Sequence, residues 1–204
     1  VRSAKLHAMT IIEGDVAPGF ELVRDAFDKN FTSRGDVGAA FCLYKGGEKV
    51  VDLWAGVADV DAGTPWTPDM LQTVFSCTKG ATAACAHLLA QRGLLDFDAP
   101  VAQYWPEFKA NGKENIPVRW LLSHRVGLPA LDAPLTNEQL LAWDPVFAAL
   151  AAKAPAWQSG TKQGYPATAF DYLVGEVIRR PSGNSSGSTR RHQISAPHVR
   201  QLST

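Results

Sequence analysis

Apolar residues recur along this chain with two different periods, which predict strands near the N-terminus and helices over the rest. Residues 37–45 and 48–55 are rich in strand-forming residues and are joined by Gly46-Gly47, a pair typical of a two-residue hairpin turn. Before them, residues 18–30 place Phe20, Val23 and Phe27 on one face of an expected helix. The first part of the chain is therefore predicted to be a helix followed by an antiparallel hairpin.

Helical patterns dominate after a turn-rich loop at residues 61–68 and a short strand-like stretch at residues 73–75. A helix is expected over 77–92, where it ends at Gly93, and small residues along it allow close packing in an interior. Shorter helices are expected at 118–123, 137–143, 146–153 and 170–179. A hairpin followed by separate helices indicates an α+β fold.

The character of the sequence changes after Arg180. The segment that begins Pro181-Ser-Gly-Asn-Ser-Ser-Gly is rich in serine, glycine and arginine and has no apolar period, as in disordered segments. We expect residues 1–180 to form the N-terminal and helical part of one domain. Residues 181–204 are expected to be a disordered tail or the product of a shifted reading frame.

Composition excludes several classes of function. The 204 residues are 46% hydrophobic, and 20 basic side chains balance 20 acidic ones, so nothing indicates nucleic acid or an anionic membrane as a partner. No apolar run approaches the length of a membrane span, and the opening residues have no signal core. The three cysteines, Cys42, Cys77 and Cys85, have no metal-ligand spacing and are expected to be buried thiols of a cytoplasmic protein without a cofactor.

Ser76-Cys-Thr-Lys79 and the distant Tyr165 are the candidate chemistry. Residues three apart share a helix face, so the Lys79 amine can lie beside the Ser76 hydroxyl and accept its proton. A tyrosine near that amine can join the same proton network. The pattern alone is weak, because Ser76 could instead be a helix N-cap and because Ser159-Gly-Thr-Lys162 also matches it.

Two other segments invite a catalytic interpretation. Gly183-Asn-Ser-Ser-Gly187 matches the nucleophile elbow of α/β-hydrolases, but a helix and Pro181 precede it where the elbow needs a strand. His124, in Leu121-Leu-Ser-His, could act as a base; a local hydrogen bond that holds a loop is the favoured role.

Five segments in order resemble the serine β-lactamase and penicillin-binding-protein superfamily, in particular its class C-like esterase branch, the family VIII carboxylesterases. These segments are residues 50–56, Phe75-Ser-Cys-Thr-Lys-Gly80, residues 92–107, Leu121-Leu-Ser-His-Arg-Val-Gly-Leu128, and residues 160–165 running into 172–178. The resemblance implies a β-lactamase/transpeptidase-like fold with Ser76 as acylated nucleophile, Lys79 as its proton acceptor and Tyr165 as partner base. The Ser76 N–H would be one oxyanion donor.

The resemblance implies a carboxylesterase that acts on small esters through an acyl-enzyme. A β-lactamase or DD-peptidase-type amidase is the alternative; such enzymes resemble Tyr-x-Asn, whereas this chain has Tyr165-Pro-Ala167, which favours esters. A truncated, inactive remnant is a third alternative, because no later Lys-Thr-Gly, His-x-Gly or Trp-x-Gly type strand motif follows Tyr165. Without those C-terminal strands we expect low activity and an exposed sheet edge through which copies self-associate.

Overall fold

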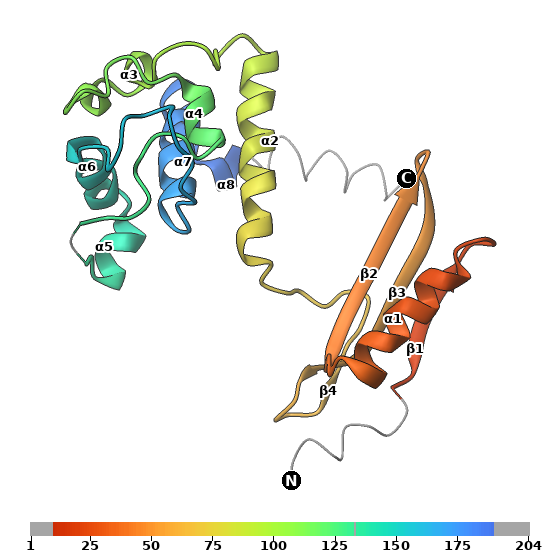
Figure 1. The fold of residues 1–204 in the computed structure, drawn as a ribbon. Coiled ribbons are helices and arrows are strands. Elements are labelled where there is room, and N and C mark those ends of the chain that lie inside the picture. The colour runs from red at the N-terminus through yellow and green to blue at the C-terminus, as the bar shows by residue number, and fades with distance from the viewer. Residues whose placement is uncertain (1–9, 133, 190–204) are drawn as a thin grey trace. The chain divides into compact units, whose positions relative to one another are not determined.

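A computed structural model describes residues 10–132 and 134–189 of the chain. The chain divides into two compact units, residues 1–73 and 74–204, which are called here the sheet unit and the helical unit. Figure 1 shows that nearly all strand structure belongs to the first and most helices belong to the second.

Over its described residues, 10–73, the sheet unit has one helix and four antiparallel strands: β1 (Ile12–Val16), α1 (Glu21–Ser33), β2 (Gly38–Lys45), β3 (Glu48–Asp59) and β4 (Thr64–Pro65). The strand order is β1-β3-β2, and β4 pairs with the end of β3. Gly46 and Gly47 both have positive φ, 60° and 86°, which the tight β2–β3 turn requires. The predicted hairpin is confirmed, but β1 and β4 were not predicted.

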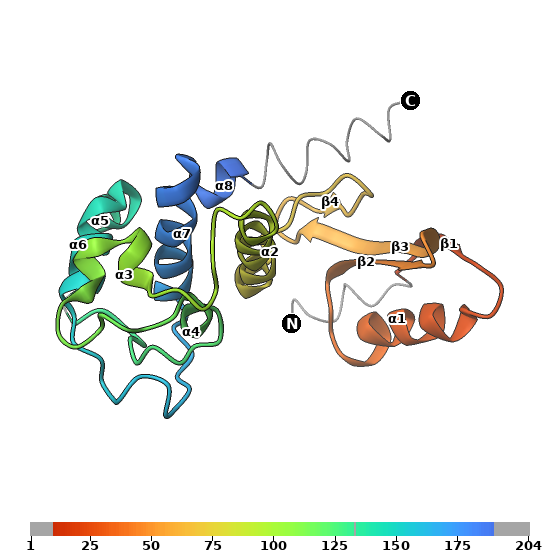
Figure 2. The same ribbon diagram turned by 90° about the horizontal axis from the view of Figure 1, so that it is seen from above.

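Alternation along β3 builds the core of this unit. Val51, Leu53 and Ala55 are buried on one face, and Phe27 and Phe31 of α1 pack against them. The two phenyl rings meet edge to face with centroids 5.3 Å apart. Figure 2 shows α1 running along that face of the sheet. A period of two in the strand and one apolar stripe in the helix therefore explain this packing.

One edge of the described sheet is formed by β2, which pairs with β3 alone among the described residues. Phe41, Cys42 and Tyr44 on this strand are exposed. Cys77 is also exposed and only Cys85 is buried, so the expectation of three buried thiols is wrong for two of them. Self-association through this edge stays a prediction.

The helical unit consists of short helices around two longer ones. They are η2 (Phe75–Cys77), α2 (Thr78–Gln91), α3 (Val101–Tyr104), η3 (Pro106–Lys109), α4 (Val118–Leu122), α5 (Asn137–Ala142), α6 (Asp144–Ala152), α7 (Ala169–Ser182) and α8 (Ser186–Thr189). Helices α2 and α7 pack side by side (Figure 2) and share one apolar core, to which α2 gives Cys85 and Leu89 and α7 gives Val174 and Ile178. No described helix has the length and apolar character that crossing a bilayer requires.

Two local expectations are wrong. Residues 73–75 form no strand; instead Phe75, with φ of 45°, begins the 3-10 helix η2 that leads into α2. The tail expected to be disordered from Pro181 is ordered as far as it is described: α7 continues through Pro181 to Ser182, Gly183 caps it with φ of 69°, and α8 follows with Thr189 buried. The rest of that expectation, on residues 190–204, lies outside the described residues.

Candidate active site

Ser76 and Lys79 lie at the junction of η2 and α2. The Lys79 Nζ is 3.4 Å from the Ser76 Oγ, as their spacing predicts, and Ser76 is exposed while Lys79 is buried. The N-cap of α2 is Cys77 and the N-cap of η2 is Val74, so Ser76 caps neither helix. The exposed hydroxyl beside a buried amine fits a nucleophile better than a structural serine.

The Lys79 amine is held from the other side by the segment that leads into α7. Its Nζ donates to the Ala167 carbonyl at 2.8 Å and lies 3.7 Å from the Asp171 carboxylate. The second oxygen of that carboxylate accepts a hydrogen bond from the Thr82 hydroxyl at 3.2 Å. The sequence motifs did not identify Ala167, Asp171 or Thr82. For Asp171 a signal does exist in the sequence, because it is an acidic residue in the first turn of a largely buried helix.

Tyr165 reaches the same amine through its ring. The Lys79 Nζ lies 5.2 Å from the Tyr165 ring centroid and 5.6 Å from that of Phe170, distances typical of cation–π contacts. The Tyr165 hydroxyl makes no hydrogen bond to a described residue, and the side chain is 54% exposed. The structure thus brings all three predicted residues together, with the phenol in ring contact rather than in a hydrogen bond to the amine.

A set of backbone carbonyls positions the irregular segment before Tyr165. Residues 153–168 form no helix or strand. Five consecutive carbonyls, of residues 123–127, each accept a hydrogen bond from it: from the Gln163 side chain, the Gly164 N–H, the Gly160 N–H, the Ser159 hydroxyl and the Ala156 N–H, respectively. This carbonyl ladder fixes the path of the chain up to Tyr165, because irregular backbone must find its hydrogen-bond partners outside regular structure.

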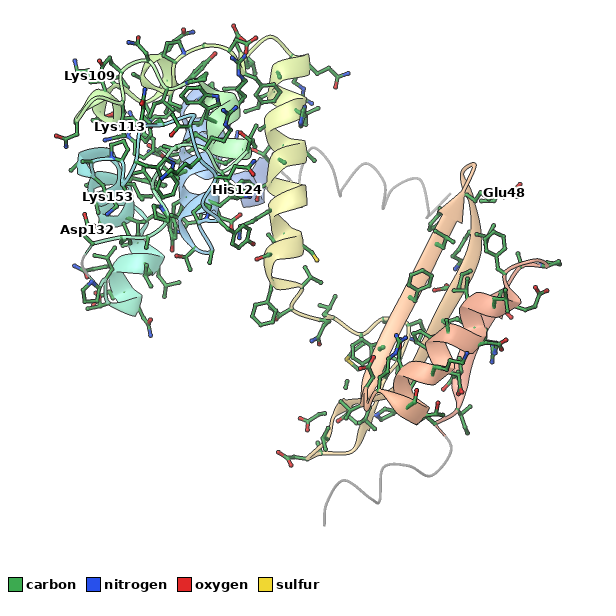
Figure 3. The ribbon with its side chains drawn as sticks, viewed as in Figure 1. Glu48, Lys109, Lys113, His124, Asp132 and Lys153 are labelled. Carbon is green, nitrogen blue, oxygen red and sulfur yellow. The ribbon has the colours of Figure 1, made fainter. Side chains whose placement is uncertain are left out.

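His124 lies in this ladder and in the helical unit (Figure 3). Its ring centroid is 5.1 Å from those of both Tyr165 and Phe170. Burial, and secondarily the Lys79 charge, lowers the pKa of His124 below its usual 6.5. Its Nδ1 is buried without a partner among the described residues, so the expected local hydrogen bond is made by its backbone and not by its ring.

The two competing serine motifs have other environments. The Ser159 hydroxyl donates to the Val126 carbonyl as part of the ladder, and Lys162 is exposed. Ser185 lies between α7 and α8 with no strand before it, unlike the nucleophile of an α/β-hydrolase elbow. Among the described residues, no group of three or more His, Cys, Asp or Glu side chains could hold a metal ion.

Comparison with known proteins identifies the family of the chain. The family model described as Beta-lactamase matches residues 24–201, which is most of the chain. The chain belongs to the Beta-lactamase family. Its α+β architecture is that of the β-lactamase/transpeptidase-like fold, with an antiparallel N-terminal sheet and a helical region.

Several known proteins are similar to nearly the whole chain. Esterase/beta-lactamase LipL of Mycobacterium tuberculosis is 39% identical over 184 residues, which are 90% of this chain and 42% of that protein. A crystal structure of a family VIII carboxylesterase is 43% identical with a TM-score of 0.88, over 92% of this chain and 51% of the other. A penicillin-binding protein homologue from Caulobacter crescentus is 38% identical with a TM-score of 0.87, over 92% and 50%. The chain thus spans about half the length of these relatives.

Proposed function

We propose that this chain carries the acylation machinery of a serine carboxylesterase. The observation that supports this most directly is the position of the Lys79 Nζ, 3.4 Å from the Ser76 Oγ, with its other side held by the Ala167 carbonyl. The similarity to an esterase and to a family VIII carboxylesterase points to an ester as the substrate class.

In the proposed reaction the Ser76 oxygen attacks the ester carbonyl and transfers its proton to the unprotonated form of the Lys79 amine. The carbonyl π electrons move to the oxygen, which becomes an oxyanion near the Ser76 N–H at the start of the helix. When the oxyanion collapses, the bond to the alcohol breaks and the alcohol leaves with the proton that Lys79 returns, directly or through Tyr165. Water then hydrolyses the acyl-enzyme by the same route, so atoms and protons balance over the cycle.

An amidase or β-lactamase is the second candidate, since a penicillin-binding protein homologue is similar over most of the chain. Position 167 supports the ester over the amide, because an asparagine there would offer an amide to a substrate amide. Here it is alanine, whose side chain has no hydrogen-bonding group. The site as built therefore favours esters.

The test is directed at the first chemical step, because the proposal concerns acylation of Ser76 and the chain covers about half the length of its relatives. The chain is treated with a fluorophosphonate probe and the labelled peptide is identified by mass spectrometry. We expect labelling at Ser76 that is lost in Ser76→Ala and kept in the matched control Ser159→Ala. Labelling that persists in Ser76→Ala would refute the proposal.

The roles of the partners are tested in the same assay. Groups that act as one unit are non-additive, so Lys79→Ala and Tyr165→Phe together should slow labelling little more than Lys79→Ala alone. Multiplying effects would show that the two residues act separately. A short-chain p-nitrophenyl ester and a chromogenic cephalosporin, compared as acylating agents, distinguish the ester from the β-lactam activity.

A further inference from the structure

Tyr165 depends for its position on groups outside its own segment. It lies in an irregular stretch, its side chain is half-exposed, and its hydroxyl has no hydrogen bond to a described residue. Two kinds of contact from the loop after α4 fix it. One is the carbonyl ladder, whose member nearest to Tyr165 is the His124 carbonyl, 3.0 Å from the Gly164 nitrogen. The other is the imidazole ring of His124 itself.

The geometry of these contacts is specific. The His124 and Tyr165 rings meet edge to face at an interplanar angle of 67°, and the Lys79 ammonium also lies against the Tyr165 ring, 5.2 Å from its centroid. Phe170 makes the same two contacts, with His124 and with Lys79. Each of the two aromatic rings therefore contacts both the His124 imidazole and the Lys79 amine, and a shift of the imidazole would displace them.

We propose that His124 is a positioning residue for Tyr165. The ring and the carbonyl of His124 together hold the Tyr165 phenol against the Lys79 amine. The contact is built into the fold, and its catalytic meaning rests on the proposed esterase function. His124 would act through Tyr165, because its ring lies against the Tyr165 ring and its buried Nδ1 bonds no described group.

Two further observations support a role at a functional site. His124 has a φ of 60°, a left-handed backbone conformation that non-glycine residues rarely adopt and that tends to persist at functional sites. Burial and the nearby Lys79 also keep the ring neutral at pH 7, since both lower the pKa of His124. A neutral ring can pack beside the Lys79 ammonium without repelling it. The ring surface of His124, and not a charge on the ring, therefore positions Tyr165.

A matched pair of variants separates the ring from its nitrogens. His124→Phe keeps an aromatic ring and removes both nitrogens, while His124→Asn keeps a polar side chain that tolerates positive φ and removes the ring. We expect the rate of Ser76 labelling by the fluorophosphonate to fall about tenfold or more in His124→Asn and to stay within about threefold in His124→Phe. Equal losses in both variants would assign the function to a nitrogen, and wild-type labelling in His124→Asn would remove the role altogether.

A double-mutant cycle tests whether the effect passes through the phenol. In a Tyr165→Phe background that retains measurable labelling, the phenol hydroxyl is already absent, so His124→Asn should slow labelling by less than about threefold. A full additional loss would show that His124 acts on the site by another route. The urea unfolding midpoint of each variant is measured to check that the variants are folded when their labelling rates are compared.

A second measurement needs no activity. The chain has four tyrosines, so 3-fluorotyrosine gives four ¹⁹F resonances, of which Tyr165→Phe identifies one. His124→Asn should shift the Tyr165 resonance and leave that of Tyr44, in the sheet unit, in place. An unmoved Tyr165 resonance would overturn the placement. If wild-type Ser76 is never labelled, the proposed function fails, while this shift still decides the positioning.

Discussion

The Glu176 carboxylate is the most buried acidic group described, and its removal should destabilise the helical unit. Its side chain has no solvent exposure and accepts three short hydrogen bonds: from the Arg179 Nε and Nη2 at 2.6 and 2.7 Å, and from the Arg180 Nε at 2.6 Å. These bonds raise the pKa of both arginines. Glu176→Gln keeps the shape of the side chain but leaves two cations next to a neutral amide.

The expected magnitude follows from burial. Breaking one side of a fully buried ion pair costs about 3–5 kcal/mol. Here the arginine side chains are 41% and 31% exposed, so water partly solvates the freed cations and the cost is lower. We expect the free energy of unfolding to fall by about 2–3 kcal/mol, a large part of the ~5–15 kcal/mol typical of a folded domain.

Glu107→Gln is the matched control, since it removes a carboxylate from the same Arg180. That carboxylate is 60% exposed and lies 3.3 Å from the Arg180 Nη2, so its loss should cost less than about 1 kcal/mol. Urea unfolding followed by circular dichroism measures both variants, with a change in midpoint at constant slope as the criterion. The reasoning is refuted if Glu176→Gln unfolds within about 0.5 kcal/mol of Glu107→Gln.

Three further predictions use other buried groups. Lys113 (Figure 3) is fully buried and donates hydrogen bonds to the carbonyls of residues 110, 151 and 153. Lys113→Met should therefore lower the urea midpoint, with a loss of about 2–3 kcal/mol in unfolding free energy. The control Lys109→Met, at an exposed position, should leave the midpoint nearly unchanged. Gly160 has a φ of 85°, and a Cβ at this position would lie 2.4 Å from the Trp120 ring. Gly160→Ala should therefore disturb the carbonyl ladder, which lowers the melting temperature and slows the labelling of Ser76. An unchanged melting temperature would contradict this prediction. Because burial lowers the pKa of His124, the unfolded chain takes up its proton first, and stability is lost as pH falls below about 6.5. Unfolding free energies at about pH 7.5 and 5.5 should therefore differ less in His124→Phe than in the wild type, and equal differences would reject that role for His124.

The sequence by itself determined what depends on local period and local chemistry. The β2–β3 hairpin follows from alternation around Gly46-Gly47, and the Ser76–Lys79 contact follows from a spacing of three residues on a helical path. Sequence reasoning failed where local signals were short or ambiguous. β1 has only five residues, and the apolar stretch before Ser76 reads as a strand although Phe75 turns into a 3-10 helix. Pro181 and the serine-rich segment after it are not typical of helices, so the sequence predicted neither the end of α7 nor the presence of α8.

The tertiary structure alone decided how the site is held together. The carbonyl that binds Lys79 belongs to Ala167, and a backbone carbonyl has no signature in the sequence, because every residue carries one. The carbonyl ladder of residues 123–127 and the ring of His124 meet the Tyr165 segment about 30 to 40 positions along the chain, across a separation that no local period encodes. A periodic pattern specifies which face of an element is buried, but which loops then meet is set by how the elements pack, and here that packing brings Tyr165 and Asp171 close to Lys79.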